Sequence, residues 1–203
     1  MRTVNDVNQS EHHLQLFDSS KSLVETVSSF LRDGFDRCEP LLIVATPVHL
    51  QMLTRRLGET GLNLREAQLA GRATLLDADQ TLQKFMRNEM PSRIAFDEVV
   101  GGLIARLANG RRMCIYGEMV DVLAARGHYK AAIQLEEFWN LLGARESFNL
   151  FCGYASGHFG DARTAKALAD ICASHHHVHR KSSDLLAEFL LDQQAPSATS
   201  SRS

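Results

Sequence analysis

Apolar residues along this chain follow two periods, one typical of buried strands and one typical of amphipathic helices. Residues 41–46 form a continuous apolar run, which predicts a central parallel strand buried on both faces. A shorter strand is predicted at 13–18, where Leu14 and Leu16 alternate with His13, Gln15 and Phe17. Further strands are predicted at 73–76, 113–116 and 148–154.

Helical spacing of apolar residues separates these strands. Ser19 or Ser20 suits the cap of a helix whose apolar residues recur to Leu31, and Pro47 suits the first turn of a second helix ending near Gly58. Further helices are predicted at 81–86, 92–108, 129–142 and 162–172. Because strands joined through helices pair in parallel, the predicted fold is α/β, a three-layer α/β/α sandwich with a mostly parallel central sheet.

The length of 203 residues fits one domain with short ends. Residues 1–11 are polar and are predicted to be a flexible N-terminus, and residues 12–179 form the domain. An amphipathic C-terminal helix is predicted at 180–194. Residues 195–203 are rich in Ser, Ala and Thr, which predicts a disordered tail.

Composition and net charge argue against several classes of function. A net charge of -2 argues against direct nucleic-acid binding, which depends on neutralising phosphates. The chain has no apolar leader and no apolar run of about 18 residues, so we expect a cytoplasmic protein with no membrane contact. Buried free thiols are favoured over a disulfide or metal set for the four cysteines, which are Cys38, Cys114, Cys152 and Cys172.

The scaffold lacks the phosphate loop that nucleotide enzymes of this class carry. Ligands bind open α/β sheets beyond the carboxyl ends of the strands. The first such junction, 17–22, reads Phe-Asp-Ser-Ser-Lys-Ser, and the second, 44–49, reads Val-Ala-Thr-Pro-Val-His. A phosphate cradle needs glycines that turn backbone N–H groups toward the anion and a lysine that meets its charge. Neither junction meets both requirements.

Glu118 is the most interesting polar residue at this predicted edge, because it directly follows the strand at 113–116 and Gly117. A carboxylate in that place could bind a metal or activate water. The favoured interpretation is a helix-start carboxylate that interacts with the helix dipole. His13 could reach the same crevice, although a core histidine satisfied by a backbone carbonyl is slightly favoured.

Other polar segments carry weaker signals. The segment 175–179, His-His-His-Val-His, has the composition of a metal site, but adjacent side chains point in different directions, which favours a solvated or capping segment. Glu136 and Glu137 are predicted to mark the solvated side of their helix. Ser156 lacks the Gly-x-Ser-x-Gly spacing of a nucleophile elbow.

Several ordered segments together resemble one family. They are 13–17, 43–47, 71–78, 116–120 (Tyr-Gly-Glu-Met-Val), 135–140 (Leu-Glu-Glu-Phe-Trp-Asn), 151–154, Phe159 and 175–178. Their order and spacing resemble the MEDS domain, a sensory domain named for methanogens, methylotrophs and the dichloromethane-responsive regulator DcmR. The likeness covers roughly residues 11–179.

The resemblance implies a RecA-like or KaiC-like fold without a working phosphate loop, used for sensing. It also implies a histidine kinase or a regulator protein as partner and a small organic molecule as ligand, and it leaves a homodimer open. Phe17 stands where the family pattern suggests Tyr, and no kinase, receiver or helix-turn-helix segment follows. We therefore expect a stand-alone sensory domain that passes its signal to another protein.

The leading hypothesis is a non-catalytic domain that binds its ligand or partner at the carboxyl edge of the sheet. No catalytic residue or metal ligand is predicted, and the sequence does not identify a cofactor. The predicted binding residues are His13, Phe17, Thr46, Glu118, Cys152 and Tyr154. The alternative is a divergent nucleotide hydrolase or transferase that uses Glu118 and Lys21. A third hypothesis is an interaction protein whose former nucleotide site is filled by side chains.

Overall fold

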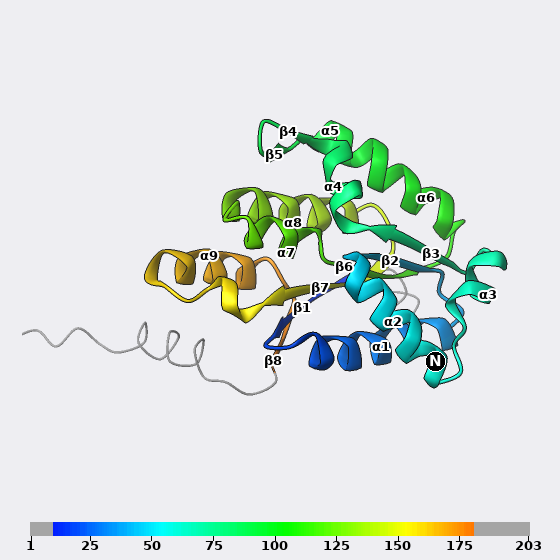
Figure 1. Ribbon diagram of the computed structural model, residues 1–203. Helices are drawn as coiled ribbons and strands as arrows, with labels where there is room; N and C mark the ends of the chain where they lie inside the picture. The colour runs from blue at the N-terminus through cyan, green and yellow to red at the C-terminus, as the bar shows by residue number, and fades with distance from the viewer. Residues whose placement is uncertain (1–9, 181–203) are drawn as a thin grey trace, which may run out of the picture.

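The computed structural model describes residues 10–180, which form a parallel sheet covered by helices on both faces (Figure 1). The sheet has six strands in the order β3-β2-β6-β7-β1-β8, and every pairing in it is parallel. The predicted three-layer α/β/α class is confirmed. The strands are β1 (Glu11–Phe17), β2 (Leu41–Ala45), β3 (Ala73–Asp77), β6 (Met113–Gly117), β7 (Phe148–Ala155) and β8 (His177–Arg180).

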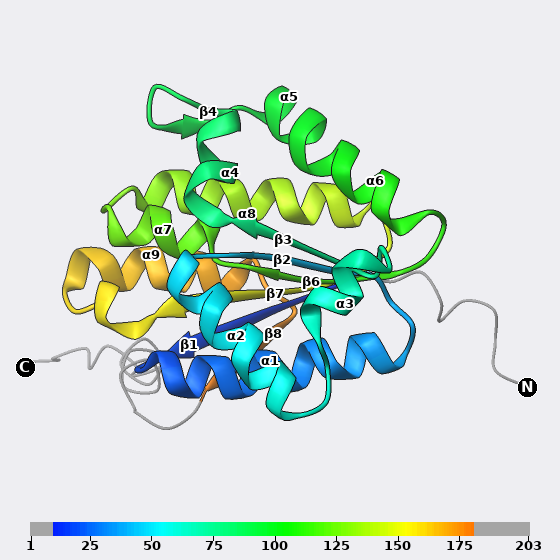
Figure 2. The same ribbon diagram turned by 45° about the vertical axis from the view of Figure 1, so that its right-hand side comes forward.

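The helices fall into two layers (Figure 2). One face of the sheet carries α1 (Ser20–Asp36), α2 (Pro47–Glu59) and α3 (Leu64–Leu69). The other carries α4 (Ala78–Phe85), α5 (Arg93–Phe96), a π-helical turn (Asp97–Gly101), α6 (Gly102–Ala108), α7 (Met119–Ala125), α8 (Tyr129–Gly143) and α9 (Ala162–Ala173). A short hairpin of β4 (Met86–Arg87) and β5 (Met90–Pro91) joins α4 to α5.

Strand β2 shows why the sheet separates two cores. All five of its residues are buried, as the apolar run predicted. Leu41, Ile43 and Ala45 belong to the core under α1–α3, whereas Leu42 and Val44 belong to the core under α4–α9. Successive side chains of a strand point to opposite faces, so one apolar run supplies both layers.

Local capping explains where several helices begin. The Ser19 side chain accepts a hydrogen bond from the N–H of Ser22 at the start of α1, and Asp77 caps α4 in the same way through Gln80. Pro47 occupies the first turn of α2, as predicted. These caps place the helix starts beside the carboxyl ends of β1, β2 and β3.

The structure differs from the sequence prediction in a few elements. It adds α3, α7 and the β4–β5 hairpin, which are too short to give a clear periodic signal. The segment 175–179 was predicted to be solvated or capping, and this holds in part: residues 176–179 are exposed, and His175 Nδ1 lies 2.7 Å from the Ile171 carbonyl in the last turn of α9. His175 itself is buried, however, and the strand β8, which begins at His177 and pairs with β1, was not predicted. Strand β1 begins at Glu11, so it includes the last residue of the segment 1–11 that was predicted to be flexible.

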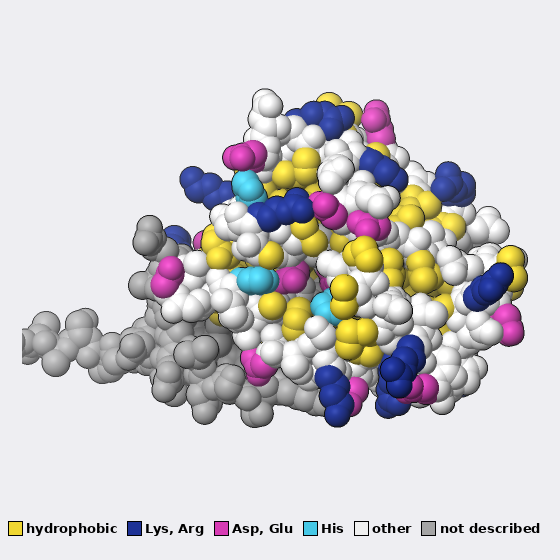
Figure 3. Space-filling model, in the orientation of Figure 1, with side chains coloured by type: hydrophobic (Ala, Val, Ile, Leu, Met, Phe, Trp, Pro, Cys, Tyr) yellow, Lys and Arg dark blue, Asp and Glu magenta, His cyan; other side chains and the backbone are white. Residues whose placement is uncertain are grey.

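The predicted amphipathic helix at 180–194 and tail at 195–203 lie outside the described residues, apart from Arg180, which ends β8. The same holds for residues 1–9 of the predicted N-terminal segment. Within 10–180, no helix is both long and apolar enough to cross a membrane. On the face shown in Figure 3, basic and acidic side chains are interspersed, in keeping with the net charge of -2.

Two helical glycines give a matched test of the packing between α1 and β6. A Cβ added to Gly34 would lie 2.5 Å from the Cβ and Sγ atoms of Cys114, whereas a Cβ on Gly58 would meet nothing within 4 Å. We expect Gly34→Ala to lower the free energy of unfolding by about 1–3 kcal/mol because the core has no room for the methyl group. We expect Gly58→Ala to raise it by about 0.5–1 kcal/mol through helix propensity. Urea denaturation measures both values, and equal effects of the two substitutions would contradict the packing.

Candidate functional site

The Glu118 carboxylate lies buried at the carboxyl edge of the sheet, between β6 and α7, with only 1% of the residue exposed. One oxygen, Oε2, accepts a 2.8 Å hydrogen bond from the backbone N–H of Thr46. The other, Oε1, accepts a 2.6 Å bond from the Tyr116 hydroxyl and lies 2.8 Å from Nδ1 of His49. Burial raises the pKa of Tyr116, which keeps its hydroxyl protonated as a donor. Both oxygens of Glu118 are therefore engaged by the protein itself.

His49 extends this contact to the first junction. Its Nε2 atom lies 2.9 Å from the hydroxyl of Ser20, the first residue of α1. The hydrogen bond to Glu118 holds the pKa of His49 above its usual value, against the opposing effect of burial. Ser20, His49 and Glu118 thus join the junctions that follow β1, β2 and β6.

A second carboxylate at the same edge is also engaged. Asp121 Oδ1 accepts a 2.8 Å hydrogen bond from the backbone N–H of Ala155 at the end of β7 and lies 3.2 Å from Nε2 of His158. Burial raises the pKa of Asp121. Glu118 and Asp121 each accept a hydrogen bond from a backbone N–H group at the end of a strand. A bound anion would otherwise be expected to accept hydrogen bonds from such N–H groups.

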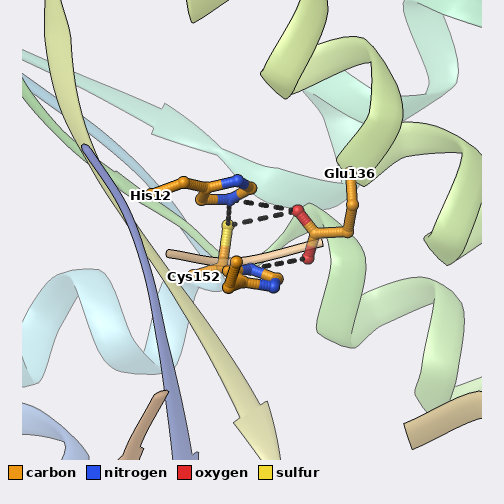
Figure 4. A group of neighbouring side chains, drawn as sticks. His12, Glu136 and Cys152 are labelled. Atoms are coloured by element: carbon orange, nitrogen blue, oxygen red, sulfur yellow. Dashed lines mark hydrogen bonds and ion pairs between the residues drawn. The ribbon is translucent and has the colours of Figure 1, made fainter. Parts of the chain in front are cut away.

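A separate buried polar cluster surrounds Glu136 on the α8 side of the sheet. Its four members, His12, Glu136, Cys152 and His175, are buried and come from β1, α8, β7 and the turn after α9. Figure 4 shows the side chains of His12, Glu136 and Cys152 turned toward one another. His12 Nε2 lies 3.2 Å from Glu136 Oε2 and 3.3 Å from Cys152 Sγ. The Tyr154 hydroxyl donates a 2.7 Å bond to Glu136 Oε1.

Hydrogen bonds to groups outside the cluster fix the ring orientations of His12 and His175. His12 Nδ1 lies 2.8 Å from the side-chain oxygen of Asn140, and the amide nitrogen of Asn140 donates to the carbonyl of Ser174. His175 Nδ1 lies 2.7 Å from the carbonyl of Ile171. Each acceptor requires a proton on Nδ1, so Nε2 is the nitrogen that each ring turns inward, and it is the unprotonated one whenever the ring is neutral.

The charges in this cluster influence one another strongly. Burial would raise the pKa of Glu136, but His175 and His12 outweigh it and lower the pKa well below its usual value. Burial alone would lower the pKa of His175. The Glu136 carboxylate outweighs burial, so the pKa of His175 is raised above its usual value. Burial, together with Glu136, raises the pKa of the Cys152 thiol.

The structure divides the six residues predicted to bind a ligand into three groups. Phe17, Thr46 and Glu118 lie around His49, whose ring centroid is 6.0 Å from that of Phe17. Cys152 and Tyr154 both contact Glu136 instead. His13 lies apart from both groups, with its ring stacked near those of Phe151, His177 and His179.

Sequence reasoning missed several polar residues. Glu136 was placed on the solvated side of its helix, and this is wrong, since the residue is wholly buried, whereas Glu137 is exposed. Its spacing from Ala132 and Trp139 puts it on the apolar stripe of α8, which could have revealed its burial. The roles of His12, His49 and His175 depend on contacts between distant segments. Of the thiols expected to be buried, Cys38 is in fact exposed.

Two cavities lie away from Glu118. One of about 510 Å³ lies where the β4–β5 turn, the α7–α8 connection and α9 meet, and its lining includes Met90, Tyr129 and Ile133. Another of about 330 Å³ lies at the amino end of β1, and its lining includes His12 and Asn140. Helix α8 contributes residues to both cavities and to the buried cluster.

Comparison with known proteins identifies a family and a shared fold. The model of the MEDS family, described as "MEthanogen/methylotroph, DcmR Sensory domain", matches residues 11–176. No curated protein matches. An uncharacterized protein from Pyrococcus horikoshii, solved with an unknown peptide, is 13% identical over 84% of this chain and 76% of its own, with a TM-score of 0.54, which shows a similar fold.

A KaiC-like protein from the hyperthermophilic archaeon Pyrococcus horikoshii OT3 is also 13% identical, over 74% of this chain, with a TM-score of 0.49. The chain covers 65% of that protein, which is less than two thirds of its length.

The contact between His49 and Glu118 predicts a pH-dependent stability. Because the pKa of His49 is raised in the folded state, the protonated ring stabilises the fold below its unfolded pKa of about 6.5, and this contribution is lost as pH rises through the folded pKa. We expect the free energy of unfolding to be higher for wild type than for His49→Gln. This difference should be largest at about pH 6 and should shrink toward about pH 9. Urea denaturation of both proteins across this range measures the difference, in which other titrating groups cancel. A difference that grows with pH would refute the assignment.

Proposed function

Because this chain belongs to the MEDS family of sensory domains, we propose that it is a non-catalytic sensory domain of the cytoplasm. It binds a small organic molecule or a partner protein and modulates a histidine kinase or a transcriptional regulator. A ligand acts in such a domain by favouring one arrangement of its helices over another.

The engagement of Glu118 is the observation that carries the non-catalytic part of this proposal. An acid that activates water or binds a metal needs an accessible oxygen near the reacting group. Both oxygens of Glu118 instead accept hydrogen bonds from protein donors, and the residue is almost completely buried. The carboxylate thus occupies the junction after Thr46, where the sequence offers neither glycine nor lysine.

The surroundings of Lys21 also argue against nucleotide hydrolysis. The alternative function as a nucleotide hydrolase would need this lysine to meet a phosphate at the carboxyl edge. The Lys21 side chain is exposed and lines the groove between α1 and α2 together with Glu25 and Arg55. Ser20 stands where a phosphate loop has the glycine that precedes its lysine, and its hydroxyl instead lies 2.9 Å from Nε2 of His49.

The cavity of about 510 Å³ is the place that best suits a small organic ligand. Its volume lies within the range of about 300–1,000 Å³ that is typical of ligand pockets. Met90, Tyr129 and Ile133 supply apolar surface, while charged side chains of both signs, among them Lys130 and Asp170, line its edge. Since Tyr129 and Ile133 belong to α8, a ligand bound here would act directly on the helix that carries Glu136.

The catalytic alternative is tested with ATP. We expect the purified protein to hydrolyse ATP no faster than background, with no difference between wild type and Glu118→Gln. Isothermal titration with ATP and Mg²⁺ should show no tight binding, because the edge is filled by side chains. A robust ATPase rate that depends on Glu118 would overturn the non-catalytic assignment.

The ligand cavity is tested by filling it. Native mass spectrometry of the protein purified from its source organism should detect a retained small molecule as added mass. Ile133→Trp should remove that mass because the indole occupies the cavity, whereas Leu141→Trp, at a half-exposed position of the same helix, should retain it. Retention by both variants would place the ligand elsewhere.

A further inference from the structure

Four side chains that suit a transition metal converge in the α8 core. One ligand atom from each of His12, Glu136, Cys152 and His175 lies within 4.8 Å of all the others, and every one of these residues is buried. Imidazole, thiolate and carboxylate are the three protein donors that zinc prefers, and four of them complete a tetrahedral shell. We propose that these four residues bind one zinc ion.

The separations among His12 Nε2, Cys152 Sγ and Glu136 Oε2 are close to the edges of a zinc tetrahedron, whereas His175 Nε2 approaches the other carboxylate oxygen, Oε1. Zinc bonds of about 2.0–2.3 Å at tetrahedral angles give distances of about 3.3–3.6 Å between ligand atoms. His12 Nε2 lies 3.2 Å from Glu136 Oε2 and 3.3 Å from Cys152 Sγ. His175 Nε2 lies 3.4 Å from Glu136 Oε1, and Cys152 Sγ lies 3.7 Å from Glu136 Oε2.

The outer contacts prepare both imidazoles for a metal. A histidine that binds a metal through one ring nitrogen typically donates the other N–H to a carbonyl or carboxylate oxygen. His12 does so toward Asn140, and His175 does so toward the carbonyl of Ile171. Asn140 is itself oriented by its bond to Ser174, and Tyr154 donates to the Glu136 carboxylate. All of these contacts leave the lone pairs of both Nε2 atoms facing the cluster centre.

Without a metal, the inner contacts of this centre are incomplete. His175 Nε2 is buried and makes no well-formed hydrogen bond, although it lies 3.4 Å from a carboxylate oxygen. A buried polar atom without a hydrogen-bond partner is costly. When zinc binds, the Cys152 S–H bond breaks, the sulfur forms a bond to zinc and the proton leaves to solvent. Zinc, thiolate and carboxylate then sum to zero charge, which suits a buried site.

The cavity beside the cluster gives an entry path. It measures about 330 Å³, and its lining includes both His12 and Asn140. A zinc ion in the cluster would tie β1, β7 and α8 to the turn between α9 and β8. The zinc site does not rest on the proposed function, since it shares no residue with the Glu118 group, and the ATP measurements neither support nor refute it.

The test uses the full-length protein, stripped of metal with a chelator and titrated with zinc or cobalt. We expect wild type to bind about one equivalent of zinc. Cobalt in the same site should show the intense visible bands of a tetrahedral ion and a sulfur-to-cobalt charge-transfer band. Cys152→Ser should abolish the charge-transfer band, and His175→Gln and Glu136→Gln should lose stoichiometric zinc.

Matched controls separate this result from a general loss of structure. Cys114→Ser removes a thiol that is equally buried on the opposite face of the sheet, and Glu137→Gln removes the adjacent exposed carboxylate. Both should retain one equivalent of zinc and the full cobalt spectrum. Asn140→Ala keeps all four ligands and removes only a positioning contact, so its zinc affinity should fall about 10- to 100-fold in a chelator competition.

Three results would overturn the proposal. The first is wild-type protein that binds no stoichiometric zinc. The second is a cobalt spectrum of an octahedral site without charge transfer. The third is undiminished zinc binding by Cys152→Ser or His175→Gln. If a ligand variant does not fold, the affinity and cobalt spectrum of Asn140→Ala decide the question, and an unchanged affinity there counts against the site.

Discussion

Burial of two glutamates is the constraint around which the polar chemistry of this domain is arranged. Glu118 and Glu136 are both almost fully excluded from water. A buried carboxylate is tolerated only when donors or cations compensate for the lost hydration. The fold brings residues from distant segments into contact with each carboxylate. At these two places, hydrogen bonds and ion pairs specify the tertiary structure in addition to apolar packing.

The two carboxylates meet this constraint in different ways. Glu118 has enough donors, because a backbone N–H, a phenol and an imidazole lie within hydrogen-bond distance of its oxygens. That arrangement ties three strand-to-helix junctions together and leaves no open oxygen for a substrate. Glu136 instead lies among two imidazoles, whose outward nitrogens already bind carbonyl oxygens, and a thiol. Four side chains that can bind a metal converge there and His175 Nε2 makes no well-formed hydrogen bond, which is the reason to propose a cation.

Helix α8 connects these observations to sensing. It lines the larger cavity with Tyr129 and Ile133, carries Glu136 in the buried cluster and ends beside the smaller cavity at Gly143. Membership in the MEDS family assigns the domain a sensory role. In the function proposed above, a ligand that moves α8 changes the cluster that holds the turn between α9 and β8.

The layers of the fold could be predicted from the sequence, whereas most contacts of its buried polar side chains could not. The apolar run of β2 and the caps of α1 and α2 are local signals, and the elements that they predicted are present. Glu118 was recognised because it directly follows a strand. His49 and His12 acquire their partners only when segments 69 and 124 residues apart meet, as in the pairs His49–Glu118 and His12–Glu136. Patterns along the sequence do not report such contacts, and Glu136 was assigned to solvent because charged residues usually lie there.

X-ray absorption at the zinc edge of the metal-loaded protein distinguishes the proposed zinc site from other metal binding, because it reports the ligand atoms around the ion. For the proposed site we expect one sulfur at about 2.3 Å and three nitrogen or oxygen atoms at about 2.0–2.1 Å. A shell of nitrogen and oxygen alone, or one with six ligands, would contradict it.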